Sequence, residues 1–251
     1  MGYHDSKTKI IGIKQLNGPL YRFCSFPSFV KLLQDKCLVF RNFQSWDDPY
    51  EGYLFNTIKT DKGKSKIIKI IEELKHAHGQ FLIHMLRDMS NCPYAQSWTK
   101  LAESDALWRI YSFSNQAIRI EIDIEDIPKL NGVQTHDIIY KDFESLQEEV
   151  KDALMDDGVN WNDLFLKKRK AFEHEQEVRL LLDPRLDKIG QKITNENNST
   201  IDVSFLKINN FIKSVMVHPM AERWYEETVR KFCAEKGVSF IGKSKLYELN
   251  I

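Results

Sequence analysis

The sequence predicts a single α+β domain over residues 1–251, because short strand-like segments are interspersed with amphipathic helices along one uninterrupted chain. The clearest strand is predicted at 116–124, where apolar and polar residues alternate strictly. The clearest helix is predicted at 221–237 and closes at Gly237. No stretch is rich enough in Pro, Gly or Ser to divide the chain, and no internal period indicates a repeat protein.

The strands are predicted from short runs of β-branched and aromatic residues bounded by turn residues. They are expected at 19–25, 38–43, 94–100, 116–124, 133–143, 177–183, 201–206, 212–219 and 238–244. Two stretches that contain Pro and Gly, 44–52 and 184–200, are predicted loops, and residues 1–17 are expected to form an N-terminal tail.

The helices are predicted from apolar residues that recur with the helical period. They are expected at 26–37, 64–90, 103–112, 143–172 and 221–237. Ser25 suits the cap of the first helix, and Pro27 suits its first turn. An acidic first turn favours the start of the helix at 103–112.

The composition excludes several classes of protein. The 36 basic residues balance the 36 acidic residues, so no net charge draws the chain to nucleic acid or to an anionic membrane. No stretch approaches the roughly 20 apolar residues of a membrane span. The four cysteines are scattered without ligand spacing, and no common phosphate-binding loop is present. We therefore expect a cytoplasmic, reduced chain with no metal, in which His218 is a satisfied turn or core residue.

Three separate features could share one chemistry. Arg22 is a cation within an apolar strand, where a buried charge needs a partner. Ser97 and Thr99 flank Trp98, so both hydroxyls lie on one strand face. Glu175 and Glu177 would share a face if their segment is extended, and Arg179 would continue that face as a counter-ion.

Each feature also has an ordinary structural interpretation, which the sequence leaves open. Arg22 fits an edge strand, with its charged end in water. Ser97 and Thr99 are good strand residues in their own right. The two glutamates fit a solvated helix end, and Glu173 and His174 beside them are expected to face solvent.

In this order, the features resemble the Arg, Ser-x-Ser/Thr and Glu-x-Glu set of the ADP-ribosyltransferase superfamily. The resemblance implies split mixed and antiparallel sheets around an NAD cleft, with NAD as co-substrate. It implies that Arg22 contacts the phosphates of NAD, that Ser97 and Thr99 brace the site, and that Glu177 holds the ribose. Glu175 would guide the acceptor. The elements lie farther apart than in compact family members, and an insertion at 64–90 would explain the difference.

The chain also looks like a bacterial family known only as a domain of unknown function. The shared marks are "LYRF", "WDDPYEG", "SWTKLAESDALWRIYS", "AIRIEID" and "FEHEQEVRLLL", which together span most of residues 19–183. The strand with "LYRF", followed by a helix and "CLVF", resembles the first elements of DNA- and RNA-modifying transferases of toxin–antitoxin systems. This resemblance implies a toxin or phage-defence effector with a cognate antitoxin.

The residue types suit this chemistry. Cleavage of the nicotinamide–ribose bond creates a cationic sugar, which a carboxylate such as Glu177 stabilises. Glu175 could accept the proton of the nucleophile. Arg22 can bind a pyrophosphate through two parallel hydrogen bonds. The aromatic residues expected at the cofactor are Tyr21, Trp98, Trp108 and Tyr111.

The predicted function is therefore an NAD-dependent ADP-ribosyltransferase that modifies nucleic acid or protein. The basic run 167–170 would suit a phosphate backbone, although a solvated helix face explains it as well. One alternative is a non-catalytic binding module of the same fold. Another is a metal-dependent nuclease that uses Asp47, Asp48 and Glu51. The oligomeric state and the acceptor stay open.

Overall fold

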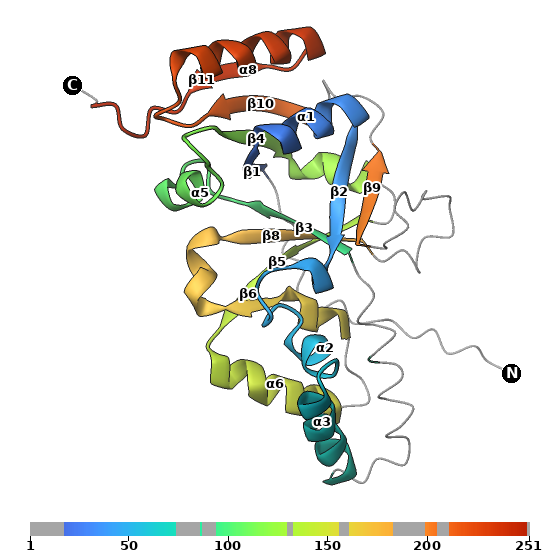
Figure 1. Cartoon of the computed structure of the whole chain (residues 1–251). Coiled ribbons are helices and arrows are strands. Elements are labelled where there is room, and N and C mark those ends of the chain that lie inside the picture. Colours follow the sequence, from blue (N-terminus) through green and yellow to red (C-terminus); the bar gives the residue numbers. More distant parts are fainter. Residues whose placement is uncertain are drawn as a thin grey trace, which may run out of the picture.

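The computed structural model describes residues 18–73, 86, 94–129, 133–155, 161–182, 199–204 and 211–249. The expected tail at 1–17, most of the expected loop at 184–200 and nearly all of the expected helix after Glu73 lie outside the described residues. Within them the chain is an α+β fold, as predicted (Figure 1).

A nine-stranded sheet forms the centre of the described structure. Its strands run in the order β11-β10-β4-β1-β3-β2-β9, and β8 and β5 continue from β3. Neighbouring strands are antiparallel except for β10 and β11. The strands are β1 (Pro19–Ser25), β2 (Cys37–Asn42), β3 (Tyr94–Thr99), β4 (Ala117–Asp123), β5 (Val133–Asp137), β8 (Glu177–Leu182), β9 (Thr200–Ser204), β10 (Ile212–Val217) and β11 (Phe240–Lys243).

The sheet forks along one edge of β3. The other edge of β3 pairs with β8 over its full length. At the forked edge, β1 pairs with β3 only at Thr99, whereas β2 pairs with it only at Tyr94 and Ala95. Gln96 spans part of the gap, because its Nε2 donates to the Val39 carbonyl at 3.0 Å. The middle of β3 therefore lies beside an opening between two diverging strands.

Helices cover the sheet in separate groups (Figure 1). The helices are α1 (Phe26–Asp35), α2 (Tyr53–Thr57), α3 (Asp61–Glu73), α5 (Asp105–Ile110), α6 (Phe143–Met155) and α8 (Arg223–Lys236). Apolar residues of α1 and α8 pack against β4, β8 and β10 in the largest core cluster. A second cluster joins α2, α3 and α6, and a third packs α5 against β1. Among the described residues, no helix is long and apolar enough to cross a membrane.

The segment predicted as one helix over 143–172 is the main error in the expected elements. Among the described residues of this segment, the α-helix is α6, which ends at Met155. It is followed by a 3-10 helix (Trp161–Leu166), the short strand β7 (Lys167–Arg169) and a second 3-10 helix (Lys170–Glu175). Strand β7 pairs in parallel with β6 (Ile139–Lys141). The single strand predicted at 133–143 corresponds to two strands, β5 and β6. Leu164, Phe165 and Leu166 lie in the second core cluster, and they reach it from the 3-10 helix.

Candidate functional site

A pocket opens at the fork between β1 and β3. It is lined by Tyr21, Arg22, Phe23, Ser97, Trp98, Thr99, Leu107, Tyr111, Glu175 and Glu177. The structure thus brings together eight residues that the sequence singled out, from β1, β3, the end of α5 and the start of β8. Trp108 is the predicted residue that does not line it.

Glu177 is the first residue of β8, and both of its carboxylate oxygens are held. Oε1 accepts from Ser97 Oγ at 2.7 Å and from Arg179 Nε at 2.7 Å. Oε2 accepts from Lys168 Nζ at 3.1 Å. Burial alone would raise the pKa of Glu177, but Arg179 and Lys168 outweigh it and hold this pKa at about 2. Glu177 is therefore a fixed anion at neutral pH.

Arg179 is the counter-ion predicted two residues along the strand, and it is fully buried. Its Nη2 pairs with Glu51 Oε2 at 2.6 Å, and its Nη1 donates to the Phe165 carbonyl at 2.7 Å. Its guanidinium also lies 4.6 Å from the ring centroid of Trp46. Alternation along β8 was enough to predict this residue beside Glu177. It could not reveal Glu51, which is 128 positions away.

Glu175 reaches the pocket by a route that the sequence did not predict. The segment is not extended, since Glu175 ends a 3-10 helix and Gln176 is left-handed with φ of 42°. The condition for a shared strand face, an extended segment, is therefore not met. The two glutamates meet instead at Lys168, whose Nζ lies 2.7 Å from Glu175 Oε2 and 3.1 Å from Glu177 Oε2. Glu173 and His174 are exposed, as expected.

The two hydroxyls of β3 hold different parts of this segment. Ser97 donates to the Glu177 carboxylate, whereas Thr99 Oγ1 donates to the Glu175 carbonyl at 2.6 Å. The Glu177 amide, in turn, donates to Tyr140 Oη at 2.8 Å. One face of β3 thus fixes one side chain and one backbone group of the predicted Glu-x-Glu pair.

Arg22 lines the opposite wall of the pocket, on β1. Its Nη1 is buried and has no hydrogen-bond partner within the described part of the chain. Burial lowers the pKa of this guanidinium, and no carboxylate in the described residues pairs with it. A buried donor without a partner is costly, which favours an anionic ligand at this wall.

Tyr111 lies between the two walls. Burial raises the pKa of its hydroxyl, Glu175 raises it further, and Arg22 and Lys168 oppose this shift. The hydroxyl is therefore within electrostatic reach of Arg22 and Glu175 at once. Tyr111 as a whole residue is 42% exposed.

Two of the predicted aromatic contacts need correction. Trp108 is fully buried, packs edge-on to Phe23 at 4.7 Å between ring centroids and donates its Nε1 to Glu103. It cannot stack on a ligand in this pocket, because the core occupies its faces. Trp98 lines the pocket, but its ring belongs to the main core and its Nε1 donates to Gln96 at 2.9 Å.

The basic run 167–170 is neither a helix face nor a free cationic patch. Lys167 pairs with Glu149, Lys168 with the glutamates of the pocket, and Arg169 with Asp48. Of the four, only Lys170 is exposed. His218 is buried against Trp108 and accepts from the Met220 amide, so its expected role as a core residue is confirmed.

The carboxylates of "WDDPYEG" do not gather into a metal site. Asp48 accepts from Arg169, and Glu51 pairs with Lys168 and Arg179. Among the described residues, no group of three or more His, Cys, Asp and Glu side chains is arranged to hold a metal ion.

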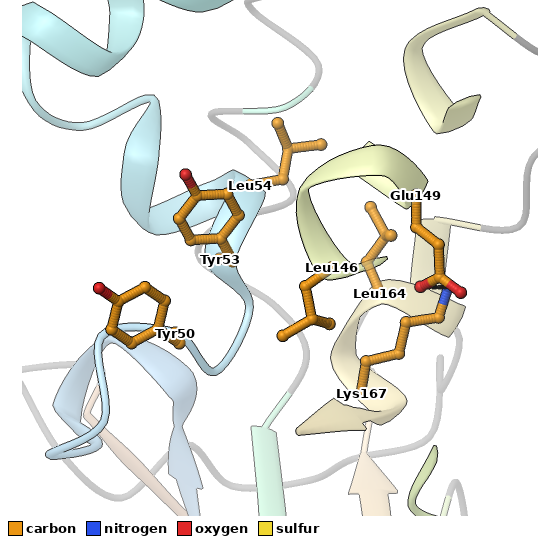
Figure 2. A pocket seen from close by; sticks show the side chains of 7 residues that line it. All are labelled: Tyr50, Tyr53, Leu54, Leu146, Glu149, Leu164 and Lys167. Atoms are coloured by element: carbon orange, nitrogen blue, oxygen red, sulfur yellow. Dashed lines mark ion pairs between the residues drawn. The ribbon is translucent and has the colours of Figure 1, made fainter. Parts of the chain in front are cut away.

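A second hollow lies away from the fork, and Figure 2 shows its lining. Tyr50 and Tyr53 stack there at an interplanar angle of 13°. The charged groups are Glu149 and Lys167, which pair with each other at 2.6 Å. Because its charges are paired and none of the residues predicted for the NAD site lines it, the pocket at the fork is the candidate site.

No family model matches the chain, and no curated protein matches it. Among solved structures, the chain is similar to DarT of Thermus sp. 2.9, in complex with NAD+. The two chains are 10% identical with a TM-score of 0.38, over 90% of this chain and 95% of that one. This level of similarity does not define the function of the chain, which the geometry of the pocket bears on directly.

Proposed function

We propose that the chain is an NAD-dependent ADP-ribosyltransferase, an enzyme of the glycosyltransferase class. The observation that supports this most is the opposite charge of the two pocket walls. Glu177 supplies a fixed anion on one wall, and Arg22 supplies a buried donor without a described partner on the other. NAD has a matching pattern, with a cationic nicotinamide ribose at one end and an anionic pyrophosphate in the middle.

The proposed reaction assigns one task to each group. The bond between C1′ of the ribose and the nicotinamide nitrogen breaks, and its electron pair leaves with nicotinamide. Glu177 stabilises the positive charge that develops on the sugar. The acceptor then attacks C1′, and Glu175 takes the proton that the acceptor loses. Arg22 binds the pyrophosphate, and Tyr111 contacts a ring of the dinucleotide.

The biological setting of the proposal rests on the sequence resemblance alone. It is a bacterial toxin or phage-defence effector that acts in the cytoplasm on nucleic acid or protein, with a cognate antitoxin that silences it. The pairing of Lys167, Lys168 and Arg169 with acidic residues removes one argument for a nucleic-acid acceptor. The labelling experiment below therefore has to determine whether the acceptor is nucleic acid or protein.

The main alternative is a binding module that holds a dinucleotide in the same pocket without cleaving it. The binding module is favoured by the observation that both carboxylate oxygens of Glu177 already accept hydrogen bonds from the chain, as those of a structural carboxylate do. The nuclease alternative loses its support among the described residues, because Asp48 and Glu51 are both paired with cations.

Incubation with radiolabelled NAD and a mixed cell lysate tests the proposal. We expect label in RNA, DNA or protein, with release of nicotinamide. Glu177→Gln keeps the shape but removes the charge, and should lower the rate by about 100- to 1000-fold, as loss of one preorganised electrostatic group does. Glu173→Gln is the matched control, because Glu173 is exposed four positions upstream.

Three outcomes separate the hypotheses. Label transfer that depends on Glu177 supports the transferase. Binding of NAD measured by calorimetry, with no release of nicotinamide, would support the binding module instead. If the folded chain neither binds NAD nor releases nicotinamide, both the transferase and the binding module are contradicted.

A further inference from the structure

Five charged side chains form one connected cluster behind the pocket. They are Glu51, Lys168, Glu175, Glu177 and Arg179. Three carboxylates and two cations leave the cluster with one excess negative charge. All five are buried except Glu175, which is partly exposed. Lys168 is the only member that contacts all three carboxylates.

We propose that Lys168 is a positioning residue that holds Glu175 and Glu177 together as one unit, with Glu51 as its anchor. This inference rests on the proposed transferase function for its meaning, but its structural core can be tested without that activity. The resemblance to ADP-ribosyltransferases singled out the two glutamates and gave Lys168 no role.

The contacts of Lys168 match the capacity of an ammonium group. A lysine has three N–H donors, and three carboxylates surround this one. Nζ lies 2.7 Å from Glu175 Oε2, 3.1 Å from Glu177 Oε2 and 3.2 Å from Glu51 Oε1. It also lies 4.9 Å from the ring centroid of Phe172. Strand β7 fixes the backbone of Lys168, because it pairs with β6 at Tyr140.

Glu175 depends on Lys168 more than Glu177 does. Glu177 sits in a strand and accepts from Ser97 and Arg179 as well. Glu175 precedes a left-handed residue and is outside the sheet. Thr99 donates to the backbone carbonyl of Glu175, whereas the side-chain carboxylate of Glu175 forms an ion pair with Lys168. Loss of Lys168 would therefore release the carboxylate of Glu175, the proposed proton acceptor. It would also leave Glu175 and Glu177 without the cation that lies between them.

The groups that face Glu177 come from several elements. They are Ser97 from β3, Arg179 from β8, Lys168 from β7, Glu51 from the loop before α2, Glu175 from the 3-10 helix, and Tyr140 from β6. Tyr111 and Arg22 line the same pocket.

Lys168 is charged under all ordinary conditions. Burial would lower its pKa, but Glu177, Glu51 and Glu175 outweigh that effect and raise it. Lys168 is in turn one of the two cations that depress the pKa of Glu177. Removal of its charge leaves Arg179 and the Ser97 hydrogen bond against desolvation and the neighbouring carboxylates, so the pKa of Glu177 should rise.

The first experiment follows the Glu177 carboxyl carbon by NMR, with ¹³C-labelled glutamate and Glu177→Gln to assign the signal. In the unmodified chain this signal should not titrate between about pH 4 and 8, since the pKa is about 2. In Lys168→Met the signal should titrate within that range. Lys168→Arg keeps the charge and should restore the flat profile.

The second experiment measures nicotinamide release against pH. Lys168→Met should lower kcat by about 100-fold, a loss typical of misplaced catalytic groups, with little change in KM for NAD because Lys168 does not line the pocket. The remaining activity of Lys168→Met should fall further as the pH drops. The activity of the unmodified chain should not show this additional fall at low pH. A purely structural role would lower activity equally at every pH.

Lys167→Met is the matched control. Lys167 is the neighbouring residue of β7, and its partner is Glu149 in the second hollow (Figure 2). It should leave both the NMR titration and the pH profile unchanged. If Lys168→Met fails to fold, Lys168→Arg and the NMR titration of Lys168→Gln carry the test.

The outcomes distinguish this inference from the proposed function. A Glu177 signal that stays flat in folded Lys168→Met would overturn the positioning role. No nicotinamide release by any variant, with the NMR shift as expected, would contradict the transferase and leave the charge cluster as described. A Lys168→Met enzyme with unchanged kcat and pH profile would also overturn the inference.

Discussion

Two arginines, Arg22 in the pocket lining and Arg179 in the charge cluster behind it, lie in opposite electrostatic surroundings. Arg179 on β8 has two carboxylate partners and a backbone carbonyl. Arg22 on β1 has a buried Nη1 with no partner among the described residues. The charges on the β8 side are therefore paired within the described chain, whereas Nη1 of Arg22 on the β1 side is not. If Arg22 binds the proposed pyrophosphate, this second arrangement lowers stability in favour of recognition.

The largest expected effect is on the β8 side. Arg179→Met leaves Glu51 and Glu177 buried with Lys168 as their remaining counter-ion. Breaking a buried pair by removing one partner typically costs about 3–5 kcal/mol. Urea unfolding at pH 7 should show a loss of free energy of unfolding of this size. A loss below about 1 kcal/mol would contradict the view that this side is held by its charges.

The opposite sign is expected on the β1 wall. Arg22→Met removes a buried donor that has no described partner, so the free energy of unfolding should stay unchanged or rise by about 1 kcal/mol. The same change should weaken NAD binding by about tenfold, the loss expected for one charge-assisted hydrogen bond. Urea unfolding and calorimetry measure the two effects separately. Destabilisation beyond about 2 kcal/mol would show that Arg22 has a structural partner.

The smallest effect is expected where a charge pair lies in water. Arg230 and Glu226 pair at 2.7 Å on α8, and the Arg230 side chain is 57% exposed. An exposed pair one helical turn apart contributes about 0.3–0.5 kcal/mol. Glu226→Gln removes this pair and keeps the contact of Arg230 with the Phe240 ring, so it should change the free energy of unfolding by no more than that, and high salt should abolish the difference. This variant gives the reference value of an exposed arginine–glutamate pair, with which the effects at Arg22 and Arg179 can be compared.

Several parts of this arrangement could be predicted because they depend on neighbours in the chain. Alternation along a strand put Ser97 and Thr99 on one face, and it put Arg179 beside Glu177. Alternation in 116–124 and the closing Gly237 likewise located β4 and α8. In each case the determining contacts lie within a few residues, where sequence pattern and backbone geometry are linked directly.

Other parts depended on contacts that no local pattern records. The run 167–170 reads as four equivalent cations, yet Lys168 is buried among carboxylates and Lys170 is exposed. Trp108 reads as an available ring, yet α5 turns it into the core. Strand β7 was hidden in an expected helix, because three residues paired with β6 are too short to show a period.

By itself, then, the sequence determined the α+β class, most of the strands and the residue types that could hold a cationic sugar and a pyrophosphate. Only the tertiary structure decided that β1 and β3 fork to open a pocket, and that Glu51, 117 positions before Lys168, completes the cluster that fixes Glu175 and Glu177. The physical reason is the same in both cases. Strand divergence and the pairing of distant buried charges are set by which segments pack together, and a single chain read in order does not contain that information.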